Sequence, residues 1–269
     1  MRHGWPRAHL KGTNLPSLNL VDGAREGLSM ISSIDHLIIR AEDLDTAVDQ
    51  YRELGFTVVS GGRHPHGTHN ALISFQDGSY LELIAFWDVE AAAESPARQG
   101  LGLTQYALAS DDLSGDVEAI NGRGLDFAGP HDGARARPDG VQVAWKTAGS
   151  GDWSNRPTLP FFIEDVTARE VRVPGGESAI HANGIQGIAR ITVEVADLPV
   201  TVERYAALLD AAPTKAAEDR AEFEVGPHLI ELCAGSAGGG LVGAALIGER
   251  GFEISTDAAS GARLEVVTG

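Results

Sequence analysis

The chain has 269 residues, 43% of them hydrophobic and 22% charged, with a formal net charge of -17. This is the composition of a folded globular protein. An acidic chain without a basic run lacks the cationic face that nucleic acids and anionic membranes attract, so we expect neither as a partner.

No segment reaches the roughly 18 consecutive apolar residues of a membrane span. The single cysteine, Cys233, excludes a disulfide within the chain and favours a reducing, cytoplasmic location. We expect Cys233 to pack in the core as a small apolar side chain. Residues 1–30 show neither a periodic pattern nor the apolar run of a secretory signal, and we expect a loose N-terminal extension.

The first ordered pattern begins at Ile34. Residues 34–44 predict a strand that ends in an acidic turn, with Asp43 as the N-cap of a helix over 46–54. Gly55 is a stop signal for that helix. Three further strands are predicted at 56–60, 71–75 and 80–86, which gives the order βαβββ.

The same order recurs along the chain. The copies align without gaps on a repeated acidic-Leu pair: Asp43-Leu44, Asp112-Leu113 and Asp197-Leu198. In the second copy we predict a strand at 104–113, a helix at 115–123 and strands at 141–147 and 159–164. In the third copy we predict a strand from 190, a helix at 200–209 and strands at 221–225 and 228–233. A fourth copy (241–247, 252–255 and 263–267) lacks a helix.

One βαβββ unit is a curved half-sheet, and two units side by side enclose a cleft. We therefore predict an α+β fold with a paired βαβββ domain at 31–168, a linker at 169–184 and a degenerate βαβββ domain at 185–269. The alternative is an ordinary α+β sheet protein in which the repeated pattern arises by chance.

Two blocks of the first copy carry a family resemblance: RHPHGTHNALI at 63–73 and DGSYLELI at 77–84. Segments at 137–140, 159–164 and 181–184 support it. These blocks resemble the signature of glyoxalase-like domains in the vicinal oxygen chelate superfamily, which also includes bleomycin resistance proteins and extradiol dioxygenases. The resemblance implies paired βαβββ modules that hold a metal between them.

In that superfamily each module supplies one ligand from its first strand and one from its last. Carried over to this chain, the resemblance implies His36 and Glu82 from the first module and Gln105 and Glu164 from the second. Imidazole, carboxylate and carboxamide groups suit a divalent ion, with Zn, Ni, Mn, Mg and Fe all open. Alternatively, His36 is a hydrogen-bonded strand histidine, Gln105 an ordinary strand amide, and Glu164 a residue at the sheet edge.

Other residues are candidates for substrate binding. Thr68 and Asn70 could donate hydrogen bonds from the cleft wall, and Arg135 and Arg137 could clamp a carboxylate or phosphate or simply lie exposed in a loop. The histidines at 64, 66 and 69 are interpreted as part of a solvated loop.

In the third copy the residue aligned with His36 is Arg190, which cannot bind a metal and is expected to pair with Glu231. The C-terminal half is therefore expected to be a structural copy, or one that forms a homodimer.

The leading functional hypothesis is a metal-dependent isomerase or lyase that acts on a small molecule with vicinal oxygens. Its ion would stabilise a developing enediolate, with Glu164 or Glu82 as the general base. A non-catalytic protein that binds or sequesters a small molecule is the alternative. A dioxygenase is the third hypothesis, and the predicted glutamine ligand argues against it.

Overall fold

The computed structural model describes residues 31–88, 100–151, 157–235 and 239–269. The extension predicted for residues 1–30 lies outside the described residues. The fold is α+β, with tandem βαβββ modules.

The repeated acidic-Leu pair starts three helices: α1 (Leu44–Glu53), α2 (Leu113–Gly122) and α4 (Leu198–Leu209). Each aspartate accepts a hydrogen bond from a backbone N–H three residues on: Asp43 from Thr46 at 2.8 Å, Asp112 from Gly115 at 3.1 Å and Asp197 from Val200 at 3.1 Å. The leucine that follows each aspartate is buried. The pair therefore begins a helix and fixes its first turn to the core.

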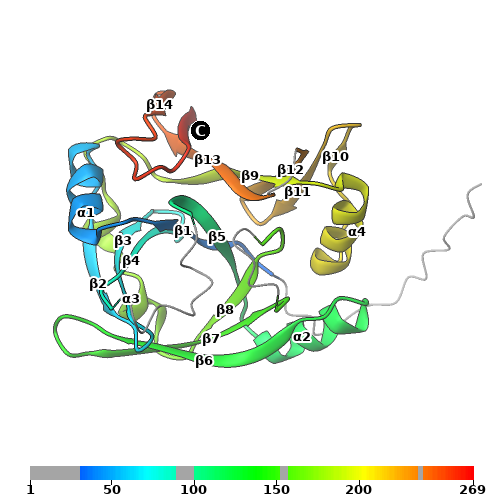
Figure 1. Cartoon of the computed structure of the whole chain (residues 1–269), viewed down its shortest axis with the longest axis horizontal. Coiled ribbons are helices and arrows are strands. Elements are labelled where there is room, and N and C mark those ends of the chain that lie inside the picture. The colour runs from blue at the N-terminus through cyan, green and yellow to red at the C-terminus, as the bar shows by residue number, and fades with distance from the viewer. Residues whose placement is uncertain (1–30, 89–99, 152–156, 236–238) are drawn as a thin grey trace, which may run out of the picture.

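The first two modules form a closed eight-stranded barrel with the order β1-β4-β3-β2-β6-β7-β8-β5 (Figure 1). Its strands are β1 (Ile34–Arg40), β2 (Val59–Arg63), β3 (Thr68–Ser74), β4 (Tyr80–Phe86), β5 (Gly102–Ala109), β6 (Ala128–Ala136), β7 (Gln142–Gly149) and β8 (Phe161–Asp165). Strand β1 runs parallel to β4 and antiparallel to β5, so the two modules join at the β1–β5 pair.

Alternation along the strands gives the barrel wall two faces. On β1, Leu37 and Ile39 face outward into the large apolar core. His36 lies on the other face, where its ring stacks on Tyr80 of β4. Tyr80 belongs to a small separate cluster with Leu72 and Val173. The barrel interior therefore holds polar groups, and the main core lies outside it.

The C-terminal half is an open seven-stranded sheet with the order β10-β11-β12-β9-β13-β15-β14. Its strands are β9 (Gly187–Val195), β10 (Lys215–Ala216), β11 (Arg220–Val225), β12 (His228–Ala234), β13 (Gly240–Gly248), β14 (Phe252–Ile254) and β15 (Leu264–Thr268). Strand β9 is parallel to β12 and antiparallel to β13, as β1 is to β4 and β5. This sheet repeats the module pair without closing a second barrel.

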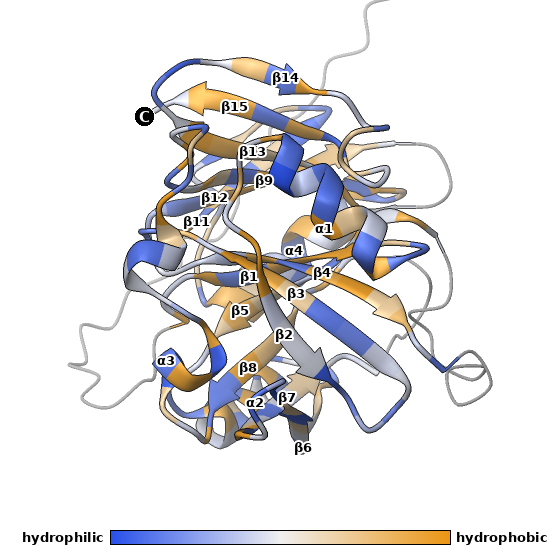
Figure 2. Ribbon diagram, turned by 90° about the vertical axis from the view of Figure 1, so that its left-hand side faces the viewer, coloured by the Kyte–Doolittle hydropathy of each residue, from blue (hydrophilic) through white to orange (hydrophobic). Residues whose placement is uncertain are grey.

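The open sheet covers the outer face of β1 and β5, with α1 and α4 at opposite sides (Figure 1). Apolar strands from both halves face each other in this layer (Figure 2). The hydroxyl groups of Tyr106 on β5 and Tyr205 on α4 hydrogen-bond across it, and Tyr205 also donates to the Thr158 carbonyl at 2.5 Å. One continuous apolar core therefore joins the two halves.

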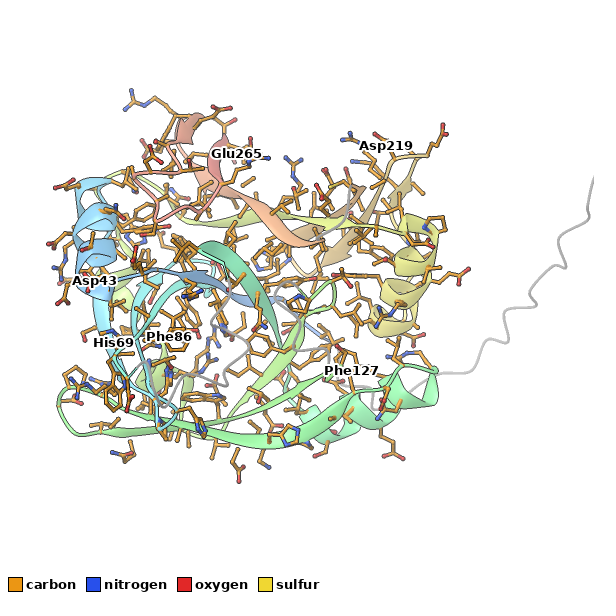
Figure 3. All side chains as sticks on the ribbon, viewed as in Figure 1. Asp43, His69, Phe86, Phe127, Asp219 and Glu265 are labelled. Carbon is orange, nitrogen blue, oxygen red and sulfur yellow. The ribbon has the colours of Figure 1, made fainter. Side chains whose placement is uncertain are left out.

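Strand β6 and the position of Cys233 differ from the sequence-based expectations. Strand β6 was not predicted, because its sequence AGPHDGARA lacks apolar alternation and is largely exposed. Cys233 was expected in the core but is half-buried on the open face of the C-terminal sheet. Arg190, on the same face, approaches Glu231 at 3.7 Å, as expected, and also Glu265 at 3.0 Å, which lies on the side away from the barrel (Figure 3).

Candidate metal centre

The barrel interior brings His36 of β1 next to Glu82 of β4. His36 is 3% exposed and Glu82 is 7% exposed, and His36 Nε2 lies 3.5 Å from Glu82 Oε2. A neutral imidazole nitrogen with a free lone pair and a carboxylate oxygen repel each other at this distance. A proton or a metal cation between the two atoms removes that repulsion.

Each of these side chains is oriented by a buried partner. His36 Nδ1 lies 2.6 Å from Asp35 Oδ1, and Asn70 Nδ2 donates to Glu82 Oε1 at 2.6 Å. Burial alone would raise the pKa of Asp35, but Arg172 and the hydrogen bonds from His36 and Arg172 hold that pKa well below its usual value. Asp35 is therefore a carboxylate that accepts the Nδ1 proton, which leaves His36 Nε2 as the free nitrogen.

Helix α3 (Arg169–Arg172) contributes two arginines that contact Asp35. Arg172 is 3% exposed and donates to both carboxylate oxygens of Asp35 (3.0 and 2.9 Å), to both of Asp165, and to the Tyr80 hydroxyl at 2.8 Å. Arg169 also donates to Asp35 Oδ2, at 2.5 Å. The two arginines and two aspartates thus balance each other's charge, and one of these aspartates, Asp35, is the partner of His36.

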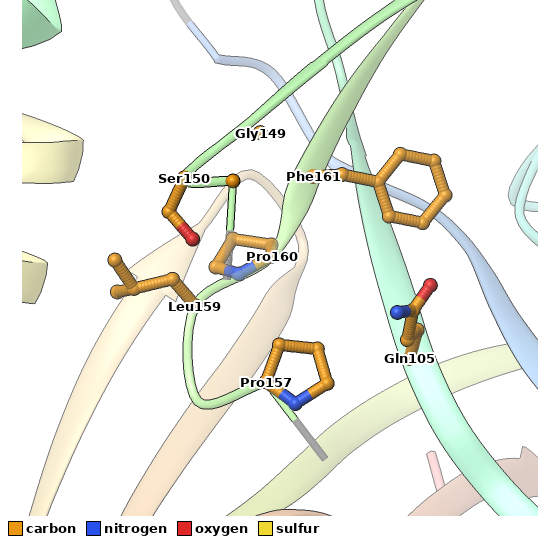
Figure 4. A pocket seen from close by; sticks show the side chains of 8 residues that line it. Gln105, Gly149, Ser150, Pro157, Leu159, Pro160 and Phe161 are labelled. Atoms are coloured by element: carbon orange, nitrogen blue, oxygen red, sulfur yellow. The ribbon is translucent and has the colours of Figure 1, made fainter. Parts of the chain in front are cut away.

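Gln105 of β5 lies on the inner face of the barrel. Ile38 of β1 is paired with Gln105 on the neighbouring strand β5 and with Glu82 on the neighbouring strand β4. Gln105 and Phe161 line the same hollow (Figure 4). That hollow has a volume of about 20 Å³, room for about one water molecule. The Phe161 ring meets the His36 ring edge-on, with centroids 5.5 Å apart.

The structure does not bring Glu164 to this centre, so its prediction as a ligand and base is corrected. On β8, Phe161 faces His36, so Glu164, three residues on, faces outward on the same side as the core residue Phe162. Its Oε2 accepts a hydrogen bond from the Leu113 backbone N–H at 2.9 Å, at the start of α2. Glu164 therefore helps to cap a helix.

Strand register identifies which residue takes the fourth position. In the first module Ile38 pairs with Glu82, and in the second the equivalent residue, Ala107, pairs with Phe161. Phe161 thus stands where the first module has its carboxylate. Consistent with this, no group of three or more His, Cys, Asp and Glu side chains converges on a metal position anywhere in the described part of the chain.

The four predicted substrate-binding residues separate into two groups. Asn70 and Arg135 are each 3% exposed and meet inside the barrel, where Arg135 Nη1 donates to Asn70 Oδ1 at 3.4 Å. Thr68 bonds the ring of His64 at 2.8 Å, at the end of β2. Arg137 is turned away, donates to the Val171 carbonyl at 3.3 Å and pairs with Asp139 at 2.8 Å.

Several residues of the centre were not recognised from the sequence. His64 was interpreted as part of a solvated loop, but it is half-buried against Trp145, and burial lowers its pKa. Asp35, Tyr80 and Arg172 were not predicted as site residues either. An aspartate inside an apolar strand was the one available signal for Asp35, because buried carboxylates need partners.

No helix in the described part of the chain is long and apolar enough to cross a membrane. A model of the glyoxalase-like domain matches residues 34–209, well over half of the chain. No curated protein matches the sequence.

Solved structures with this fold share little sequence with the chain. A hypothetical protein from Staphylococcus aureus superimposes with a TM-score of 0.73 at 15% identity, covering 88% of this chain and 99% of its own. A Mn(II)-bound glyoxalase from Novosphingobium aromaticivorans gives 0.54 at 14% identity, covering 82% and 66%. An extradiol ring-cleaving dioxygenase from B. fuscum gives 0.58 at 13% identity, covering 90% and 72%. At these identities the likeness establishes the fold.

Proposed function

Because the chain belongs to the family of glyoxalase-like domains, we propose that its barrel binds a divalent metal ion and acts on a small molecule through two neighbouring oxygens of that molecule. The observation that carries the proposal is the approach of His36 Nε2 to Glu82 Oε2 at 3.5 Å. The second polar atom of each side chain is held by a buried partner, which is the usual environment of metal ligands. The Gln105 amide oxygen is the third candidate ligand.

The donor set fits a divalent ion with several positions left for water or substrate, and the ion when bound would polarise the oxygens of a substrate as a Lewis acid. Asp35 keeps the Nδ1 proton on His36, so the Nε2 lone pair faces the site. Asn70 holds Glu82 Oε1, so Oε2 is the oxygen that faces the site, where it would bind the ion and, once released from the ion, take up a proton from the substrate. The rings of Tyr80 and Phe161 flank His36 and exclude water from it. Isomerase or lyase chemistry is the reaction class that we assign.

Metal analysis of purified variants tests the proposal. We expect wild-type protein to retain about one divalent ion per chain after metal loading and desalting, and we expect His36→Ala and Glu82→Gln to lose it. Glu164→Gln is the matched control, because it removes a carboxylate on the outer face of the same barrel. Equal metal content in wild type and His36→Ala, or loss of the ion in Glu164→Gln alone, would contradict the assignment.

A binding protein without turnover is the second candidate, and Phe161 favours it. A phenyl ring at the position equivalent to Glu82 removes one ligand and one possible base. The two candidates differ in metal content: a binder would carry no stoichiometric ion after gentle purification, whereas the enzyme would. The ligand set does not support a dioxygenase with two histidines and one carboxylate, since the described residues hold no such group.

A further inference from the structure

Arg135 of β6 is a buried cation with unused hydrogen-bonding capacity. Its side chain is 3% exposed, Nη1 donates to Asn70 Oδ1, and Nη2 donates to the Arg172 carbonyl at 2.5 Å. Its Nε is buried, and among the described residues it has no hydrogen-bond partner. A buried donor without an acceptor is rare in folded proteins, and it indicates that a ligand supplies the acceptor.

Among the described residues, Arg135 also has no counter-ion of its own. Asp35 and Asp165 are bound by Arg169 and Arg172, and Glu82 is held by Asn70 and His36. No carboxylate of the described residues lies within ion-pair distance of Arg135, and its contact with Glu82 runs through the Asn70 amide. A buried guanidinium without an ion pair is costly, so its burial favours the arrival of an anion.

The local backbone is built to admit this guanidinium. A side chain on Gly61 of β2 would place its Cβ 2.1 Å from Asn70 Oδ1 and 2.8 Å from Arg135 Nη1. Such distances are far inside van der Waals contact, so glycine is required where the Asn70–Arg135 pair passes β2. The pair is thus fitted into the wall directly beside Glu82.

We propose that Arg135 selects the substrate, and that the substrate is a small carboxylate with an oxygen on the adjacent carbon. This inference rests on the proposed function, because it takes the barrel interior as the binding site. Asn70 joins Arg135 to Glu82, so a carboxylate paired with Arg135 brings its neighbouring oxygen towards His36 and Glu82. Nε is the one nitrogen of Arg135 without a partner among the described residues, and Nε together with a neighbouring Nη N–H suits the two oxygens of a carboxylate.

The charges inside the barrel agree with this substrate class. Around His36, the carboxylates of Asp35, Asp165 and Glu82 equal in number the guanidinium groups of Arg135, Arg169 and Arg172. A divalent cation bound to His36 and Glu82 would add positive charge to this group. An anionic ligand compensates that charge, and an uncharged diol does not.

Isothermal titration of the full chain with lactate and with propane-1,2-diol tests the inference. The two probes share a carbon skeleton and vicinal oxygens, and only lactate is charged. With Mn²⁺ present, we expect wild type to bind lactate at least tenfold more tightly than the diol, since the ion pair is charge-assisted. We expect Arg135→Gln to lose at least tenfold in lactate affinity, Arg135→Lys to lose less, and the half-exposed control Arg137→Gln to match wild type.

The outcomes separate this inference from the proposed function. Each protein is also titrated with Mn²⁺ alone, and we expect Arg135→Gln to bind it as wild type does. If wild type binds no Mn²⁺ while lactate binding still depends on Arg135, the metal proposal fails and the carboxylate site stands. Equal lactate binding by wild type and Arg135→Gln, lactate binding by neither, or tighter Arg135-dependent binding of inorganic phosphate than of lactate would overturn the inference.

Discussion

His36 and Glu82 each present one polar atom to the other and have a second polar atom held by a buried partner. The partners differ in chemistry, because Asp35 accepts a proton and Asn70 donates one. Together they leave an imidazole lone pair and a carboxylate oxygen facing the same point. A carboxylate or amide behind a metal ligand fixes its orientation and raises its affinity for the ion.

This orientation predicts that Asn70 supports metal binding without touching the ion. In Asn70→Ala, Glu82 Oε1 loses its donor and the carboxylate is free to rotate, so we expect the Kd for Mn²⁺ to rise about 10- to 100-fold. Titration of the folded variant, checked by circular dichroism, measures the change. Thr68→Ala is the matched control, because Thr68 contacts His64 rather than Glu82. Unchanged Mn²⁺ affinity in Asn70→Ala would show that Glu82 does not bind the ion through Oε2.

At this scale the sequence could identify the strands that carry the site but not every side chain on them. His36 and Glu82 were predicted as ligands from the family resemblance, and the cost of burying a carboxylate without a partner inside an apolar strand supported Glu82. Glu164 was misassigned because a shift by an odd number of residues moves a strand side chain to the opposite face. Arg135 and Arg137 lie two residues apart, and the contacts that separate their roles come from Asn70 and Val171, far away in sequence.

Among the elements, α3 departs most from the sequence-based expectation. Residues 169–184 were predicted as a linker, a segment that contains Pro174, Gly175 and Gly176. Instead, the first residues of this segment form the short helix α3, and its Arg172 donates a hydrogen bond to Asp35, the partner of His36. Such a role depends on pairing with Asp35 and Asp165, which no local pattern reveals. The helices α1, α2 and α4 could be located from sequence because their caps are local.

Helix α3 is therefore predicted to stabilise the barrel through the ion pairs of Arg172 with Asp35 and Asp165. In Arg172→Met, Asp35 and Asp165 lose a buried counter-ion, and we expect the free energy of unfolding to fall by about 3–5 kcal/mol. Arg137→Met removes a half-exposed arginine whose pair with Asp139 is largely solvated, and we expect a change of about 1 kcal/mol or less. Denaturant titration of both variants measures the difference. Equal stabilities would mean that Arg169 alone compensates the two aspartates.

For the whole molecule, the sequence predicted two domains, whereas the apolar core is shared. The outer face of β1 and β5 is covered by the C-terminal sheet. Residues of this outer face and of the sheet face that covers it belong to one buried cluster. Pairing of distant surfaces is non-local, so strand patterns alone could not show which faces meet. The repeat did indicate that the C-terminal half would be a degenerate copy of the βαβββ pattern, and the absent helix of its last copy was visible in the sequence.

A shared core predicts that the barrel and the C-terminal sheet unfold together. Leu232 on β12 is fully buried in the sheet, so Leu232→Ala should cost about 2–5 kcal/mol. None of the four tryptophans follows residue 153, so tryptophan fluorescence reports on the N-terminal half, while far-ultraviolet circular dichroism reports on both. We expect the two signals of Leu232→Ala to shift together to lower denaturant, because loss of the sheet would expose the apolar wall of β1 and β5. A fluorescence transition that stays at its wild-type midpoint would instead show that the barrel is stable on its own.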